Sequence, residues 1–215
     1  MNQIKSTLIF IVAIMLMTTG CAKKASDEID FGAIKNNIYK NKYFSLSVTL
    51  PPTWSVQDEN SRKQNIKLAK KMLAGDDKNL TAVMKASEMS SVSLFTATKH
   101  PIGTPVSFNP SISCVAERIS HMPGLKTGQD YLFHAKKLLQ SSQMKVSFPK
   151  KFSNQSLGGH DFGVMYVDMN IRGTRLHQKY YATLLKGYAL AFVISFSTNE
   201  DELALQNILN SMSFE

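Results

Sequence analysis

Titratable side chains gather at two places near the end of the chain, and both have the residue types of a binding or acid–base site. His160 and Asp161 follow a glycine pair, and an imidazole beside a carboxylate could bind a metal ion. Asp168 lies near Arg175 and His177 across a short turn, where the three side chains could form a polar ligand site. A surface histidine at a turn and cross-strand ion pairing are the simpler interpretations of these two groups. We therefore expect no cofactor and no resident metal ion.

Cys21 has a distinctive sequence context. It follows the small residues Thr19 and Gly20 at the end of an apolar run from Leu8 to Met17, with a lysine before the run. A positive residue, a short apolar stretch and small residues before a cleavage point are typical of a removable export signal. A cysteine directly after them matches the bacterial lipobox, in which the sulfur receives diacylglycerol, although Thr18 replaces the usual leucine. An uncleaved anchor helix is the alternative, but the run is shorter than the about 20 residues that span a bilayer.

The export signal divides the chain into three parts. Residues 1–20 are predicted to be a lipoprotein signal peptide, residues 21–37 a lipidated flexible tether, and residues 38–215 a single globular domain. Two acyl chains hold a protein stably on a bilayer, so we expect the mature protein to be exported and anchored to a membrane. Ala22 rather than aspartate follows the cysteine. In a cell with two membranes we therefore expect the outer membrane, with the protein facing the periplasm.

Lipidation of Cys21 would leave Cys114 without a partner, so no intramolecular disulfide is expected. Cys114 lies among alternating apolar residues and is predicted to be a small core residue. A catalytic thiol paired with His121 is the alternative, and an envelope hydrolase or metal-dependent enzyme could use His160 and Asp161 as well. The chain has no H-E-x-x-H, C-x-x-C, G-x-S-x-G, Walker A or G-x-G-x-x-G motif. We therefore predict that the protein is not an enzyme.

The chain is strongly basic, with a net charge of +9. For an exported protein, lipid headgroups, cell-wall polymers or acidic envelope proteins are expected partners, and nucleic acid is not. A predicted helix carries four lysines on one face, at i, i+4, i+7 and i+8: Lys63, Lys67, Lys70 and Lys71. This lysine face, together with the loop of residues 100–110, is a candidate surface for an anionic partner. A solvated helix face is the simpler interpretation.

Residue periodicity predicts the elements that position these groups. Apolar alternation predicts strands over residues 43–50, 92–98 and 111–119. One helix is predicted over residues 57–74, with Gly75 as its stop, and another begins at a capping box of Thr127 and Asp130. Prolines and a glycine predict a loop over residues 100–110.

The last third of the chain has the clearest pattern. Three strands are predicted over residues 162–171, 175–185 and 188–196, joined by short glycine-containing turns. The third strand is apolar on both sides and must be covered twice. Thr198 with Asp201 predicts the cap of a final helix. The pieces together predict an α+β fold, in which an antiparallel β-sheet is flanked by helices on both faces.

Two stretches of this pattern resemble a known family. The first has Tyr39-Lys40-Asn41, an aromatic strand, Pro51 and Trp54. The second has Gly187-Tyr188-Ala189 before a strand and Ile208-Leu209-Asn210-Ser211-Met212-Ser213-Phe214 at the close. Both resemble PsbP-like bacterial proteins, whose superfamily includes DcrB-like exported lipoproteins, although Ser45 stands where many members carry glycine. The resemblance covers most of residues 38–215 and implies an α/β/α sandwich.

The resemblance and the lack of catalytic motifs lead to one functional expectation. Members of the superfamily are mostly non-catalytic binding or assembly proteins, so we expect a membrane-anchored envelope lipoprotein that acts as a binding or assembly module. Its expected partners are the lipid bilayer, through acylated Cys21, and an envelope protein or anionic surface. A small-ligand carrier that holds an apolar compound between sheet and helix is the alternative, beside the enzyme considered above.

Overall fold

The computed structural model describes residues 29–171 and 173–215 of the chain. The predicted signal peptide, Cys21 and Arg172 therefore lie outside the described residues. The helices are α1 (Glu59–Ala74), α2 (Lys78–Ser90), α3 (Gly128–Gln140) and α4 (Asn199–Asn210). The strands are β1 (Ala33–Lys35), β2 (Ile38–Asn41), β3 (Leu46–Thr49), β4 (Ser55–Val56), β5 (Ser91–Thr98), β6 (Ser111–Arg118), β7 (Val146–Ser147), β8 (Ser153–Leu157), β9 (His160–Ile171), β10 (Thr174–Leu185), β11 (Tyr188–Phe196) and β12 (Ser213–Phe214).

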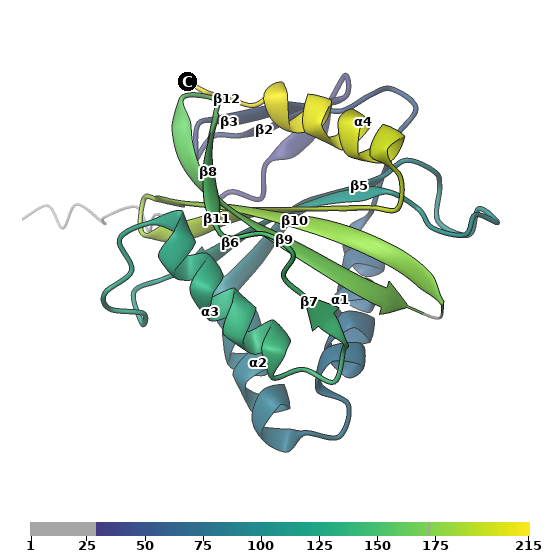
Figure 1. Ribbon diagram of the computed structural model, residues 1–215. Coiled ribbons are helices and arrows are strands. Elements are labelled where there is room, and N and C mark those ends of the chain that lie inside the picture. The colour runs from purple at the N-terminus through teal and green to yellow at the C-terminus, as the bar shows by residue number, and fades with distance from the viewer. Residues whose placement is uncertain (1–28, 172) are drawn as a thin grey trace, which may run out of the picture.

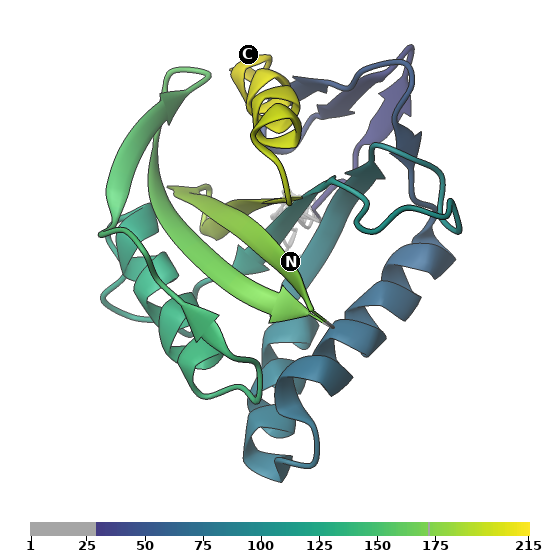
Figure 2. The same ribbon diagram turned by 45° about the vertical axis from the view of Figure 1, so that its right-hand side comes forward.

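The strands form two antiparallel sheets. The larger sheet has the order β4-β5-β6-β11-β10-β9-β7, with β8 paired to β9, and the smaller has the order β1-β2-β3-β12. Helices α1, α2 and α3 lie on one side of the larger sheet, and α4 lies on the other side with the smaller sheet (Figures 1 and 2). This is the predicted α+β fold with helices on both faces of an antiparallel sheet. The smaller sheet is an addition, because the strand predicted over residues 43–50 pairs as β3 with β2 and β12 instead of joining the larger sheet.

The predicted meander is confirmed as β9, β10 and β11. Leu185 pairs with Tyr188, so Lys186 and Gly187 alone form the loop between β10 and β11. Both loop residues have positive φ, 51° and 81°, which is the conformation that joins twisted antiparallel strands through two residues. β11 lies between β10 and β6 and is buried almost throughout, as its apolar sequence on both faces predicts.

Two apolar clusters hold the layers together. The larger lies between the main sheet, the smaller sheet and α4, and it contains Cys114, Phe192 and Leu205. The other lies under α3, where Leu132 packs with Met165 and further apolar residues of the meander. Cys114 is a core residue, as predicted. The predicted capping box at the start of α3 is confirmed. At the start of α4, the predicted cap is confirmed, because the Thr198 side chain accepts a hydrogen bond from the Asp201 amide. Both clusters lie within residues 29–214, so this part of the chain carries its own core.

The folded part begins earlier than the predicted boundary at residue 38. Ala33, Ile34 and Lys35 form β1 and pair with β2, so the end of the predicted 21–37 tether belongs to the smaller sheet. The connecting loop consists of Asn36 and Asn37, both with positive φ. Asparagine tolerates this region better than most residues, and an Asn-Asn pair can therefore form the same two-residue hairpin loop as Asn-Gly.

The helical hairpin of α1 and α2 differs most from the sequence expectation. α1 is confirmed, but Ala74 is its only buried residue, and Met72 is 39% exposed. α2 was not predicted, and it buries only Leu80. Its start is fixed by Asp77, whose side chain accepts a hydrogen bond from the Leu80 amide at 2.9 Å. Across residues 29–171 and 173–215, every helix falls short of the length and apolar character needed to cross a membrane.

Candidate functional site

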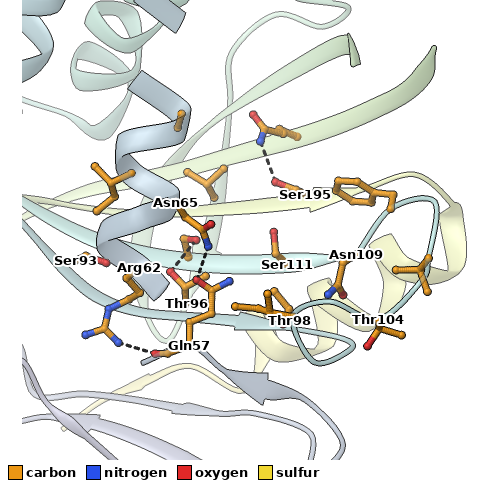
Figure 3. A pocket seen from close by; sticks show the side chains of 18 of the residues that line it. Gln57, Arg62, Asn65, Ser93, Thr96, Thr98, Thr104, Asn109, Ser111 and Ser195 are labelled. Carbon is orange, nitrogen blue, oxygen red and sulfur yellow. Dashed lines mark hydrogen bonds between the residues drawn. The ribbon is translucent and has the colours of Figure 1, made fainter. Parts of the chain in front are cut away.

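A groove of about 660 Å³ opens on the larger sheet between α1 and the loop of residues 100–110. Figure 3 shows this groove from close by, with α1 beside it and the strands beneath. Its volume lies within the range of about 300 to 1,000 Å³ that is typical of ligand sites. The loop of residues 100–110 forms one wall of the groove, and α1 forms the other with residues that are not those of the predicted lysine face.

The floor of the groove consists mainly of hydroxyl and amide side chains, with Val115 and Val193 beside them. The hydroxyl and amide residues are Ser93, Thr96, Thr98, Ser111, Ser113, Gln178 and Ser195. On β6 they alternate with Ile112 and Cys114, which point into the core on the opposite face. Under α3 the same face of the sheet carries apolar residues instead, such as Ala182 and Ala191. The polar floor therefore coincides with the part of the sheet face that stays open beside α1.

Some floor groups hold one another in place. Gln178 Nε2 donates a hydrogen bond to Ser195 Oγ at 2.9 Å, and the Tyr180 hydroxyl donates to Gln178 Oε1 at 2.7 Å. Burial raises the pKa of Tyr180, so its hydroxyl stays a donor. The hydroxyls of Ser93 and Ser111 form no hydrogen bond with any residue that the structure describes. These two hydroxyls are free to bind a ligand.

The helical wall is anchored at its first turns. Asp58 caps α1 by accepting a hydrogen bond from the Ser61 amide at 2.7 Å, and this bond lowers the pKa of Asp58. Arg62 Nη1 donates to the Gln57 carbonyl at 2.8 Å, and Asn65 Nδ2 donates to Gln57 Oε1 at 2.8 Å. Figure 3 shows Gln57, Arg62 and Asn65 together at one side of the groove.

The loop wall is fixed at its base. Asn109 Oδ1 accepts from the His100 amide at 3.0 Å, and Asn109 Nδ2 donates to the His100 carbonyl at 2.8 Å. Next to this base, Lys99 Nζ donates to Asp201 Oδ1 at 2.9 Å, which raises the pKa of Lys99 and ties the loop to the start of α4. At the rim, Ile102 is 60% exposed. The loop therefore adds an apolar edge to a polar floor.

The lining favours binding over chemistry. Arg62 is the one charged side chain among the described residues that line the groove, and these residues include no aspartate, glutamate or histidine. Activation of a serine hydroxyl requires an adjacent base, and the lining does not supply one. Its hydroxyls and amides can each donate and accept hydrogen bonds, so they suit an uncharged polar ligand.

Solved structures include proteins of similar architecture. The cyanobacterial PsbP of Synechocystis is 11% identical to this chain and has a TM-score of 0.49. The match covers 86% of this chain and 98% of the PsbP chain. LpqN of Mycobacterium tuberculosis, described as involved in cell envelope biogenesis, is 12% identical with a TM-score of 0.44, covering 78% of this chain and 82% of its own. A protein of unknown function from Pseudomonas aeruginosa, described as a putative regulator, is 13% identical with a TM-score of 0.40, covering 56% of this chain and 78% of its own.

The chain resembles PsbP-like proteins in fold. No family model and no curated protein matches the chain. At identities of 11 to 13%, the likeness concerns the general architecture alone.

The predicted lysine face of α1 is not part of the groove lining. Lys63 pairs with Glu59 of its own helix at 2.6 Å, and Lys70 pairs with Glu88 of α2. The other two lysines of the face, Lys67 and Lys71, are exposed. α1 instead presents other residues to the groove: Arg62, Asn65, Ile66 and Ala69. An anionic partner on the lysine face stays a prediction, and the two internal ion pairs reduce the charge that it offers.

The structure brings Asp168, Arg175 and His177 together, as expected from the turn between their strands. His177 is directly opposite Asp168, with Nδ1 and Oδ1 2.7 Å apart, and Arg175 Nη2 donates to Asp168 Oδ2 at 3.1 Å. Burial works to raise the pKa of Asp168, but the hydrogen bonds from His177 and Arg175 outweigh it, so the pKa is lowered overall. The His177 ring also stacks on Phe196. Cross-strand pairing therefore accounts for the observed contacts of the cluster.

His160 and Asp161 lie at the opposite end of β9, where His160 is eight positions from Asp168 and therefore roughly 26 Å away along the strand. The ring of His160 packs on Phe214, with 4.3 Å between the centroids. The predicted polar residues therefore lie in two separate groups, one at His160 and Asp161 and the other around Asp168. Among residues 29–171 and 173–215, no group of three metal-ligating side chains occurs.

Cys114 and His121 do not form a pair. Cys114 is fully buried in the core, and burial raises the pKa of its thiol far above the usual value, whereas His121 is exposed beyond the end of β6. A buried thiol with a raised pKa is a poor nucleophile. The arrangement gives no support to a catalytic thiol.

The sequence did not reveal the groove, although part of its signal was present. Alternation in β6 identified Ile112, Cys114 and Ala116 as core residues, and it placed Ser111 and Ser113 on the opposite face. A serine on the outer face of a strand is ordinarily exposed to bulk water. Only the pairing of β6 with β5 and β11 shows that these hydroxyls form one floor.

Proposed function

We propose that the protein is a lipid-anchored envelope lipoprotein and that its folded part is a non-enzymatic binding or assembly module. The groove between α1 and the loop of residues 100–110 holds a polypeptide segment of another envelope protein. The observation that carries this proposal is the polar, uncharged floor of the groove, bounded by two anchored walls.

The chemistry of the groove fits a polypeptide. Peptide groups need both donors and acceptors, and the floor offers hydroxyls and amides that supply both. The rim supplies apolar contacts through Ile66 of α1, and through Ile102 and Phe108 of the loop. A floor of paired strands is rigid, so binding would require little reordering of the protein, which favours affinity.

The membrane anchor in this proposal rests on the sequence context of Cys21. The thiol would carry diacylglycerol, and the chain would face the periplasm from the outer membrane in a cell with two membranes. Incorporation of radiolabelled palmitate, followed by membrane fractionation, tests this part. We expect label and membrane association for the unaltered chain and neither for Cys21→Ser; equal labelling of the two would overturn the anchor.

Photo-crosslinking in intact cells tests the groove. A photoreactive phenylalanine analogue placed at Val106, on the groove wall, should give a discrete adduct with a protein. The same analogue at Leu203, which is 64% exposed on α4 on the opposite side of the sheet, is the matched control and should not give this adduct.

A second substitution assigns the adduct to the groove. Ser113→Arg fills the floor with a long charged side chain, and we expect it to abolish the adduct from position 106. An adduct that forms equally from position 203, or that persists in Ser113→Arg, would overturn the proposed site. Thermal unfolding of each variant verifies that the fold is retained.

A further inference from the structure

A second cavity lies on the same side of the larger sheet, in the trough between α2 and α3. Its volume is about 660 Å³, and it is separate from the groove beside α1. Its walls are mostly apolar, with Leu80 and Val83 of α2 facing Ala135 and Leu138 of α3. Val83 is 56% exposed although it points into the trough, so this apolar surface lacks a partner within the described part of the chain.

A buried carboxylate lies at the base of the trough. Glu117, near the end of β6, is only 7% exposed. Its Oε1 accepts hydrogen bonds from the hydroxyls of Ser87 at 3.0 Å and Ser90 at 3.3 Å, and its Oε2 accepts from the Tyr131 hydroxyl at 2.8 Å. A carboxylate has about four acceptor positions, so one position on Oε2 remains open.

Among the described residues, no positive group forms an ion pair with this carboxylate. Each ion pair among the described residues involves another acid, and none includes Glu117. Lys137 also lines the trough, but its ammonium group lies 4.5 Å over the ring of Phe133. A buried carboxylate that is held only by neutral hydroxyls favours a cation as its neighbour.

The end of α2 adds to the negative potential. Ser87 and Ser90 belong to its last turn, which contains no basic residue, and the one acid of that turn, Glu88, is paired with Lys70 of α1. The C-terminal end of a helix carries a partial negative charge that basic residues ordinarily offset. A chain with a net charge of +9 therefore contains one apolar trough whose base is electronegative.

We infer that the trough between α2 and α3 is a binding site for an amphiphile with an ammonium head group. The head group lies at Glu117 and donates to the open position on Oε2, while the apolar tail lies along Leu80, Val83 and Leu138. This site is distinct from the groove beside α1, and the inference holds whether or not that groove binds a polypeptide.

Three small amphiphiles with the same tail test the head group. Octylamine, 1-octanol and octanoate are titrated calorimetrically into residues 21–215 carrying Cys21→Ser, a chain that needs no detergent. We expect octylamine to bind at least about tenfold more tightly than either of the others, because only the ammonium group pairs with Glu117. Equal affinity of octylamine and octanol for the unaltered trough would overturn the inference without any further variant.

Two substitutions then locate the site. Glu117→Gln removes the charge but keeps an acceptor oxygen for Ser87 and Ser90, and its NH2 group can donate to the Tyr131 hydroxyl but cannot accept from an ammonium group, so we expect octylamine to fall to the affinity of octanol. Ala86→Trp fills the trough from α2 and should abolish binding of both. Glu202→Gln, which removes an acid on the opposite face, is the matched control and should change neither affinity. Octylamine selectivity that survives Glu117→Gln, or binding that survives Ala86→Trp, would contradict the site.

Discussion

Gly128 and Gly163 pack backbone against backbone where α3 begins over β9. A Cβ atom on Gly128 would lie 1.7 Å from the Ala182 carbonyl oxygen, and one on Gly163 would lie 2.6 Å from the Gln129 amide nitrogen. Neither glycine has a positive φ, so space and not backbone conformation requires glycine at both positions. This contact fixes how closely α3 approaches the meander.

Gly128→Ala should destabilise the protein strongly. The methyl group would meet backbone atoms, which cannot rotate away, so we expect a loss of about 3 kcal/mol or more in the free energy of unfolding. Urea denaturation followed by circular dichroism measures it. His134→Ala, an exposed position on the same helix, is the control. Similar midpoints for the two variants would show that α3 is not held by this contact.

Ser45→Gly should stabilise the protein. Ser45 adopts φ of 55° in the turn before β3, and a left-handed conformation costs a non-glycine residue roughly 1 to 2 kcal/mol. The greater entropy of glycine in the unfolded chain opposes folding and offsets part of this gain. We therefore expect a net increase of about 0.5 to 1 kcal/mol in the free energy of unfolding. Thermal denaturation checks the sign. Ser47→Gly, within β3, should lower the melting temperature instead, and an equal loss in both variants would contradict this reasoning.

Asp168→Asn should lower stability in a pH-dependent way. The folded-state pKa of Asp168 is lowered from 3.8, so its carboxylate stabilises the fold above that pH and loses its contribution as pH falls through the folded value. Near neutral pH we expect a loss of about 1 to 2 kcal/mol, because the hydrogen bonds from Arg175 and His177 are partly exposed to solvent. Melting temperatures across a pH series, with the exposed Asp161→Asn as control, should converge below pH 3.8. A constant difference at all pH values would exclude this linkage.

Cys114 should be inert in the folded protein. Its side chain is fully buried and burial raises the pKa of the thiol, so both access and thiolate formation are suppressed. In a Cys21→Ser chain we expect no alkylation by iodoacetamide under native conditions and rapid alkylation in urea. Mass spectrometry measures both. Rapid native alkylation would show that the core opens around β6.

The elements with strong local signals were predicted correctly. The meander has dense alternation and two-residue turns, and Thr127 and Thr198 have acidic residues three positions later, which identify the helix starts. Such signals are contained within a few residues of sequence. They require no knowledge of the rest of the fold.

The elements that were missed depend on distant contacts or weak patterns. α2 buries a single residue, Leu80, and its apolar residues Leu80 and Val83 line the open trough, so its short pattern was missed. β8 is mostly polar and owes its conformation to pairing with β9. The groove and the trough also combine residues from several elements. His160 and Asp168 belong to two separate places, as the sequence analysis treated them, because an extended strand separates them.

The alternation of β6 has one further consequence. Ser111 and Ser113 line the groove, while Ile112 and Cys114 between them hold the core. Under the proposed function, recognition and folding are carried by different residues of the same strand. The groove could therefore be reprogrammed for new partners one hydroxyl at a time, and evolution or a protein engineer could do this at little cost to the fold.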